Sequence, residues 1–334
     1  MRLDRVFALS CVVLVSTAIV GFSAGTTGAS FTGSSTNPNQ SWATSTVAAP
    51  ASTSATSAIA GRVDLAWPAT TTPPNGHTIT YLVLRNGTQI GTAAGLSYSD
   101  TPGSDGSYSY TVQTKIAQGA GFFTSGGGPA ASGLSDRTAP TMSATCNGGA
   151  CAGWFNSSVT FVVSGNDGTG VGMGTATTNI DAAGAATSAA PRTVTVSGES
   201  ASHSVVYSGA DAVGNASGNT TQTVAIDLTA PTAAGGVSVA TGAATGELNV
   251  SATSAGTDAL SGVAGYRIFY QQAGGTCAAT PYTTFTYFAG NPPAIPLVLT
   301  GLISGKFYCA YAVTVDNAGN LSVASNLSGR AKAR

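Results

Sequence analysis

Two pentapeptides combine an acidic side chain, a glycine and an asparagine directly after a run of alternating apolar residues. They are DAVGN at 211–215 and DNAGN at 316–320. Carboxylate and amide oxygens bind Ca2+, but this ion takes about six to eight oxygens, several of them from carboxylates. Each pentapeptide supplies one Asp and one Asn, while Asp167 and Asp258 add single carboxylates at other predicted strand ends. Calcium is therefore an alternative for these residues, and we expect no metal.

A turn explains the same residues without a ligand. An Asp that opens a turn accepts hydrogen bonds from backbone N–H groups, and a later Gly supplies a positive φ. We therefore predict hairpin turns after the sixth strand of a sandwich, with TQTVAID (221–227) and LSVASNL (321–327) as candidate last strands. The turn residues are Asp211, Gly214, Asn215, Asp316, Gly319 and Asn320.

The chain offers little for catalysis. Of its two histidines, His77 follows PPNG in a predicted loop and His203 opens the predicted strand HSVVY. A general base would also need a third group to orient the imidazole. No Gly-x-Ser-x-Gly, His-Glu-x-x-His or phosphate-loop pattern occurs. The sequence therefore predicts a protein without enzyme activity and without a cofactor.

The cysteines predict disulfides. Cys11 lies in an N-terminal apolar run and is expected to leave with it, so that four remain: Cys146, Cys151, Cys277 and Cys309. An even number in an exported protein favours disulfides, and CNGGAC (146–151) can bend tightly enough to form a local pair. The chain-entropy model gives about 2 kcal/mol for this loop and about 3–4 kcal/mol for a 277–309 loop. A zinc site would need CxxC-type spacing or a nearby His, and neither occurs.

The composition is that of a folded chain with an uncharged polar surface. Only 7% of the residues are charged, against about 25% in an average soluble protein, yet 43% are hydrophobic. Ser, Thr, Asn and Gly must supply the polar surface, which is usual for extracellular β modules. The net charge of −1 leaves no basic stripe for phosphates, so nucleic acid is not an expected partner.

The first residues resemble an export signal. Arg2 and Arg5 precede an apolar run of 17 residues at 6–22, and small residues follow it. We predict a signal peptide over 1–29, with an uncleaved anchor as the alternative because a full membrane span needs about 20 residues. Either reading places the rest of the chain outside the cell or at its surface, with membrane contact only through this segment.

Short runs of Val, Ile, Thr, Tyr and Phe bounded by turn residues predict an all-β fold. They include VDLAW (63–67), TITYLVLR (78–85), SVTFVV (158–163), GYRIFYQ (265–271) and FYCAYAVTV (307–315). No segment after residue 30 has a helical period. Strands this short, with turns this frequent, indicate β-sandwiches.

An internal repeat predicts the number of sandwiches. DRTAP begins at Asp136 and DLTAP at Asp227, 91 residues apart, and Asp167 and Asp258 are also 91 apart. The predicted organisation is an extended arm (30–47) and three modules (48–137, 138–228 and 229–334).

The third module carries an enlarged loop. The offset from Asp211 to Asp316 grows to 105, which places extra residues in 271–296. Four aromatic residues cluster there: Tyr282, Phe285, Tyr287 and Phe288. They are a candidate ligand patch that stacks on sugar rings or holds a protein, and the favoured alternative is that alternating members of the cluster cover the sandwich edge.

The first and third modules resemble fibronectin type III domains. Trp67 and Tyr81 match core positions of that family in the first module. In the third, Leu302 and Tyr308 match its leucine–turn–tyrosine corner, although Ser304 stands where the family often has Pro. The resemblance implies a sandwich fold and secretion, and it implies no particular activity.

The second module resembles bacterial Ig-like repeats, through GWFNSSVTFVVSGNDGTGV (153–171), HSVVYSGADAVGN (203–215) and the closing IDLTAP (226–231). The arm resembles the mature start of SipW-dependent signal-peptide proteins, some of which form matrix fibres. That resemblance rests on Phe31, Asn37, Ser41 and Trp42.

These features predict an exported adhesive or structural spacer whose partner is an unknown protein or polysaccharide of the cell surface. One alternative is a glycan-binding accessory of polysaccharide degradation that uses the aromatic loop. Another is a fibre subunit in which the arm 30–47 adds a strand to a neighbour's sheet.

Overall fold

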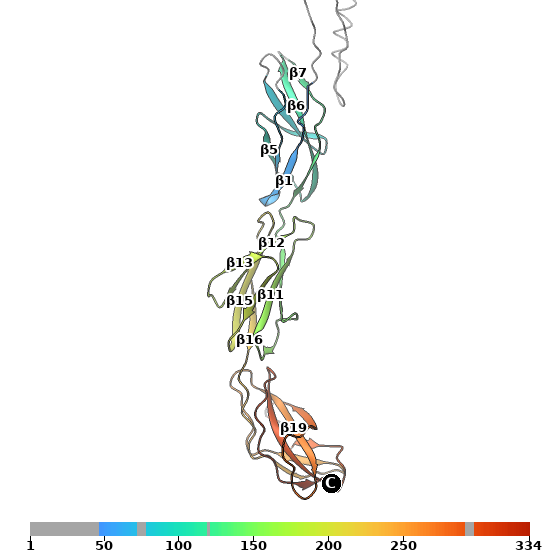
Figure 1. The fold of residues 1–334 in the computed structure, drawn as a ribbon, viewed down its shortest axis with the longest axis vertical. Coiled ribbons are helices and arrows are strands. Elements are labelled where there is room, and N and C mark those ends of the chain that lie inside the picture. Colours follow the sequence, from blue (N-terminus) through green and yellow to red (C-terminus); the bar gives the residue numbers. More distant parts are fainter. Residues whose placement is uncertain (1–46, 72–77, 119–120, 291–296) are drawn as a thin grey trace, which may run out of the picture. The chain divides into compact units, whose positions relative to one another are not determined.

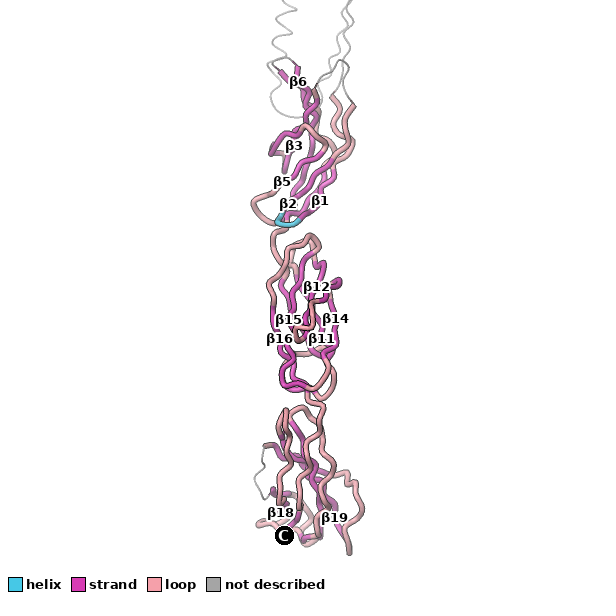
Figure 2. The backbone as a smooth tube through the Cα atoms, turned by 90° about the vertical axis from the view of Figure 1, so that its left-hand side faces the viewer, coloured by secondary structure: helices cyan, strands magenta, loops and turns pink. Residues whose placement is uncertain are grey.

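The computed structural model describes residues 47–71, 78–118, 121–290 and 297–334. The predicted signal (1–29), nearly all of the arm and His77 lie outside the described residues. The described chain is all-β, as predicted, and its one helix is the short η1 (Ile59–Gly61), drawn cyan in Figure 2. It divides into two compact units, one formed by the described part of 1–138 with 169–171, the other by 139–168 and 172–334.

The first unit contains a sandwich of two sheets around one core (Figure 1). One sheet has the strand order β1-β2-β5, and the other has β4-β3-β6-β7, with β8 also paired to β6. Alternate residues of β2, such as Val63 and Leu65, are buried because side chains of a strand point to opposite faces in turn. The strands are β1 (Ser54–Ala58), β2 (Arg62–Ala66), β3 (Ile79–Arg85), β4 (Thr88–Ala93), β5 (Ser97–Asp100), β6 (Gly106–Gln118), β7 (Gly121–Thr124) and β8 (Ala131–Ser135).

The second unit begins with a sandwich whose sheets have the orders β14-β11-β9 and β10-β16-β15-β12-β13. Its core is built on Phe161, which is fully buried and meets Tyr207 edge to face with 5.9 Å between the ring centroids. A disulfide joins Cys146 to Cys151 at one end of this core. The strands are β9 (Thr141–Cys146), β10 (Trp154–Phe155), β11 (Val159–Asn166), β12 (Met173–Ile180), β13 (Ala186–Ala189), β14 (Arg192–Val196), β15 (Ser200–Asp211) and β16 (Thr220–Ile226).

A further sandwich of the same unit has the sheet orders β17-β18-β21 and β20-β19-β22-β23, with a core of its own. Cys277 is bonded to Cys309 on β22, so the structure has the two disulfides that the sequence predicts. The predicted loop 271–296 is wrong in part, because β19 extends to Ala273 and Phe285–Ala289 pairs with it as strand β20. The strands are β17 (Ser238–Thr241), β18 (Leu248–Ser251), β19 (Val263–Ala273), β20 (Phe285–Ala289), β21 (Leu297–Leu299), β22 (Phe307–Asp316) and β23 (Ala331–Lys332).

The candidate last strand after DAVGN is confirmed as β16, but the one after DNAGN is wrong. Residues 322–327 form no regular strand. Three serines, Ser322, Ser325 and Ser328, instead follow β22 at every third position. The N–H of each serine donates to a carbonyl of β22, and its Oγ accepts the N–H of that same β22 residue. Side-chain oxygens thus stand in for the missing strand carbonyls.

The same pairing of a serine hydroxyl with a strand N–H occurs in the second sandwich, where the Oγ of Ser217 accepts the N–H of Gly209 at 2.9 Å. It also appears in the first, where Ser125 accepts the N–H of Thr114 at 2.8 Å. Such pairing satisfies buried N–H groups that would otherwise destabilise the fold by about 1–3 kcal/mol each. Among the described residues, no helix is both long and apolar enough to cross a membrane.

Candidate functional site

Three carboxylates from distant parts of the second unit come together. Asp227 follows β16, Asp258 lies in the loop between β18 and β19, and Asp316 ends β22. One oxygen of each lies within 4.8 Å of the others. Asp227 and Asp316 are buried, and Asp258 is half-buried.

Asp227 is held by both its side chain and its backbone. Its Oδ1 accepts the N–H of Thr229 at 3.0 Å and its Oδ2 accepts the N–H of Ser261 at 3.0 Å. Its own N–H donates to the carbonyl of Phe155 in β10, and its carbonyl accepts the side-chain amide of Asn320 at 2.8 Å. This residue therefore joins the end of one sandwich to two loops of the next.

Both pentapeptides are turns organised by their Asp. The Oδ1 of Asp211 accepts the N–H groups of Val213, Gly214 and Asn215, and Gly214 has φ +98°. These three bonds make the carboxylate the centre of the turn.

Asp316 organises its turn in a similar way. Its Oδ1 accepts the backbone N–H of Asn320 and its Oδ2 accepts the side-chain amide, both at 2.8 Å. Gly319 has φ +94°, a value that favours glycine. The turn residues predicted from the sequence therefore have the geometry of a turn.

The three-carboxylate cluster concentrates negative charge. Two unit charges about 4 Å apart repel by about 4 kcal/mol at an effective dielectric constant of about 20. Backbone N–H donors offset this repulsion, and a hard divalent cation would also offset it because carboxylates are its preferred ligands. Calcium at Asp258 and Asp316 stays an alternative, now with Asp227 as a further ligand that the sequence did not indicate. The only hint was the place of Asp227 in the repeated DxTAP linker.

His203 does not have the surroundings of a general base. Its Nδ1 lies 2.7 Å from Oδ2 of Asp181 and its Nε2 lies 3.1 Å from the carbonyl oxygen of Gly198, so both ring nitrogens are engaged. Burial lowers the pKa of His203, but the bonds to Asp181 and Gly198 outweigh it, and the pKa is raised overall. The hydrogen bond from His203 in turn lowers the pKa of Asp181. The pair fastens the turn after β12 to β15.

A second buried polar group lies in the first sandwich. Arg85 donates to both oxygens of Asp100, at 3.1 and 2.9 Å, and the hydroxyl of Tyr110 donates to Oδ2 at 2.8 Å. Burial and the hydrogen bond to Asp100 raise the pKa of Tyr110. Asp100 is engaged by both neighbours and is not arranged as a base.

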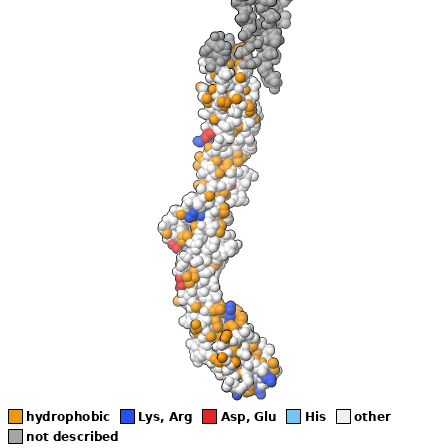
Figure 3. Space-filling view, in the orientation of Figure 1, with side chains coloured by type: hydrophobic (Ala, Val, Ile, Leu, Met, Phe, Trp, Pro, Cys, Tyr) orange, Lys and Arg blue, Asp and Glu red, His pale blue; other side chains and the backbone are white. Residues whose placement is uncertain are grey.

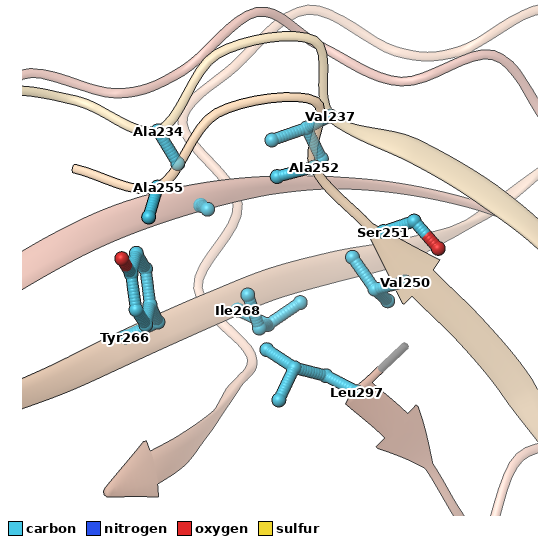
Figure 4. Close-up of a pocket in the computed structure, with 10 residues that line it drawn as sticks. Ala234, Val237, Val250, Ser251, Ala252, Ala255, Tyr266, Ile268 and Leu297 are labelled. Atoms are coloured by element: carbon cyan, nitrogen blue, oxygen red, sulfur yellow. The ribbon is translucent and has the colours of Figure 1, made fainter. Parts of the chain in front are cut away.

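The recess shown in Figure 4 lies in the core of the last sandwich. Its walls are apolar side chains such as Val250, Ile268 and Leu297, with polar atoms contributed by Ser251 and Tyr266. The hydroxyl of Tyr266 accepts the N–H of Gly256 at 3.1 Å. The recess therefore contains no acid–base pair and belongs to the core.

The predicted aromatic patch is divided by the structure. Tyr282 is buried beside Tyr311, and Phe288 packs against the core. Phe285 and Tyr287 lie on the other face of β20, with 45% and 46% of their surface exposed. Because side chains alternate along a strand, only these two form a surface together.

Several solved structures resemble the chain at low identity. Domains A168–A170 of titin match with a TM-score of 0.38 and 14% identity, over 83% of this chain and 95% of that one. The FN1–FN3 domains of chicken CNTN1 match with a TM-score of 0.37 and 14% identity, over 83% and 97%. The fibronectin(III)-like modules of Clostridium thermocellum CbhA match with a TM-score of 0.29 and 12% identity, over 52% and 90%. No protein-family model and no curated protein matches the sequence.

We predict that Asp181→Asn flattens the pH dependence of stability. The raised pKa of His203 contributes stability that is present below pH 6.5 and is lost as the pH rises through that raised value. The lowered pKa of Asp181 contributes stability that is present above pH 3.8 and is lost on acidification through its lowered value. The melting temperature of the wild type should therefore fall from pH 6 to pH 8, and that of the variant should fall less, because only the bond to Gly198 still raises the pKa of His203 there. His77 is present in both proteins, so an equal slope in both would contradict the assignment.

We predict that Asp258→Asn is as stable as the wild type in chelator, within about 0.5 kcal/mol, or more stable. The amide oxygen still accepts the N–H groups of Leu260 and Gly262, while one of three clustered charges is removed. Denaturant unfolding with EDTA measures this difference. Millimolar CaCl2 should change the free energy of unfolding of both proteins by the same amount. An increase in the free energy of unfolding that is confined to the wild type would show that an ion, rather than hydrogen bonding alone, stabilises the cluster.

Proposed function

We propose that the chain is an exported, non-catalytic protein that acts at or beyond the cell surface as a structural or adhesive spacer. Its modules would hold a partner, an unknown protein or polysaccharide, at a set distance from the surface. A spacer needs stable domains and joints that resist bending. It needs neither a reactive side chain nor a cofactor.

The joint at Asp227 is the observation that carries this proposal. The residue is fully buried, and its four backbone and side-chain hydrogen bonds reach Phe155 on one side and Ser261 and Asn320 on the other. Pro231 restricts the backbone four residues later. A joint built in this way is expected to resist bending, because bending would leave buried donors unpaired.

Polar clusters in the described residues fit the same interpretation. His203 and Asp100 are both fully engaged by neighbours. Neither has a free nitrogen or oxygen arranged toward a cleft. Both clusters instead tie one strand to a turn or to a second strand, which suits a load-transmitting domain.

Export is supported by the disulfides and by the N-terminal sequence. Disulfides at 146–151 and 277–309 persist in oxidising compartments. The segment 1–29 has the features of a signal peptide, although it lies outside the described residues. The fibre alternative depends on the arm 30–47, of which only Val47 is described.

We predict that Asp227→Ala loosens the joint in the full chain. The amides of Thr229 and Ser261 lose their acceptors, which should lower the free energy of unfolding by about 1–3 kcal/mol and speed hydrogen exchange at both amides by about tenfold or more. NMR-detected exchange measures both effects.

Asp64→Ala is the matched control, because Asp64 forms an exposed ion pair with Arg62 and should contribute less than about 1 kcal/mol. Slow exchange at Thr229 and Ser261 in the wild type supports a stiff joint. Unprotected exchange at both amides in the wild type would mean that the linker is a hinge and would refute the spacer role.

A further inference from the structure

The outer face of the sheet β20-β19-β22-β23 carries a continuous row of aromatic rings. Tyr282 lies 5.3 Å from Tyr311, Tyr311 stacks on Phe269 at 5.0 Å, and Phe269 meets Phe285 at 5.0 Å between ring centroids. The 277–309 disulfide ties the loop that bears Tyr282 to the same strand as Tyr311. The row is buried at Tyr282 and exposed at Phe285, so its exposed end rests on a rigid base.

Tyr287 is the second exposed ring of this face. A Cβ on Gly265 would come within 2.8 Å of the Tyr287 hydroxyl and 3.0 Å of its Cζ, so the phenol ring occupies the space that the glycine leaves. The rest of the side chain is open to solvent, since 46% of the surface of Tyr287 is exposed. Tyr287 and Phe285 are two residues apart on β20, which separates them by about 7 Å along the strand.

Arg267 adds a positive charge beside the ring of Phe285. It pairs with Tyr287 across the strands, and its Cζ lies 5.4 Å from the centroid of Phe285. The ion pairs found among the described residues involve Arg62, Arg85, Arg137 and His203, so the guanidinium of Arg267 has no carboxylate partner there. On the face drawn in Figure 3, hydrophobic and basic side chains gather over this last sandwich, and no acidic side chain is seen there.

We propose that Arg267, Phe285 and Tyr287 bind an acidic polysaccharide, one whose sugars carry carboxylates. The ring of Tyr287 would stack on the apolar face of a sugar, as aromatic rings do with flat partners. Phe285, which already contacts Phe269 and Arg267, would add apolar contact beside it. The guanidinium would pair with a sugar carboxylate in the bidentate manner that favours Arg over Lys. An acidic peptide fits less well, because it would use the charge of Arg267 but would leave the exposed rings of Phe285 and Tyr287 without a stacking partner.

This site does not depend on the spacer role. The joint at Asp227 involves none of its residues, so loss of sugar binding would leave the exchange of Thr229 and Ser261 unchanged. A hinge at the joint would equally leave the binding surface intact.

The test is affinity electrophoresis of the full chain without its signal, in gels that contain polygalacturonate, alginate, neutral dextran or polyglutamate. The wild type should be retarded by at least one uronate polymer and not by dextran. Tyr287→Ala and Arg267→Gln should each weaken retardation by about tenfold. Tyr287→Phe should keep it, because the ring remains, and Arg267→Lys should weaken it in part.

Matched controls are Phe122→Ala, an exposed aromatic residue of the first sandwich, and Lys332→Gln, an exposed cation of the same sandwich as the half-buried Arg267. Both should bind like the wild type, and thermal melting should show all variants folded. The proposal is overturned if neither uronate polymer retards the wild type, or if Tyr287→Ala has no effect. It is also overturned if polyglutamate binds as tightly as the uronates through Arg267 alone.

Discussion

Side-chain oxygens that accept backbone N–H groups are the interaction on which this structure depends. With only 7% of its residues charged, the chain has few ion pairs available. Asp and Ser oxygens complete hydrogen bonding where strands end or are missing. Asp211 and Asp316 close the turns after β15 and β22, and Ser322 accepts the N–H of Thr314 at the edge of β22. A buried N–H group left unpaired would destabilise a sandwich by more than a surface ion pair stabilises it.

The same chemistry extends from the turns to the joint. Asp316 holds the backbone and the side-chain amide of Asn320, and that amide also donates to the carbonyl of Asp227. A turn of one sandwich is thus hydrogen-bonded to the residue that follows the last strand of the preceding sandwich. Concentrating three carboxylates here opposes folding through repulsion, and the protein tolerates it because each carboxylate has backbone donors. The spacer proposal depends on this arrangement.

Local features could be predicted from the sequence, and so could the Cys277–Cys309 disulfide once Cys146 and Cys151 were paired. Hydrogen bonds between residues far apart in the chain could not. The all-β class and the close pair Cys146–Cys151 follow from periodicity and spacing within a few residues. The contacts of Asp227 with Ser261 and of His203 with Asp181 span 34 and 22 residues, and the register that produces them is not visible in composition or period. The serines that accept backbone N–H groups could have been recognised by their spacing, since Ser217 and Ser322 each lie six residues after the Asp of their pentapeptide.

The aromatic patch shows the same limit. Four rings in one segment look like one surface, but strand alternation in β20 sends Phe288 to the core and Tyr287 to solvent. Alternation of the four rings was the favoured interpretation of the sequence, but a segment read as a loop gives no register, so which rings are buried could not be assigned. The register between β19 and β20, which places Arg267 opposite Tyr287, is what makes a binding surface.

Hydrogen exchange at the β22 amides of Ala310, Ala312 and Thr314 tests the central claim most directly. The Oγ of Ser328, Ser325 and Ser322 is the acceptor of these three N–H groups, respectively. If side-chain oxygens complete the sheet, these amides exchange as slowly as those of β22 that pair with β19. Rapid exchange at all three, with slow exchange at their neighbours, would contradict the account.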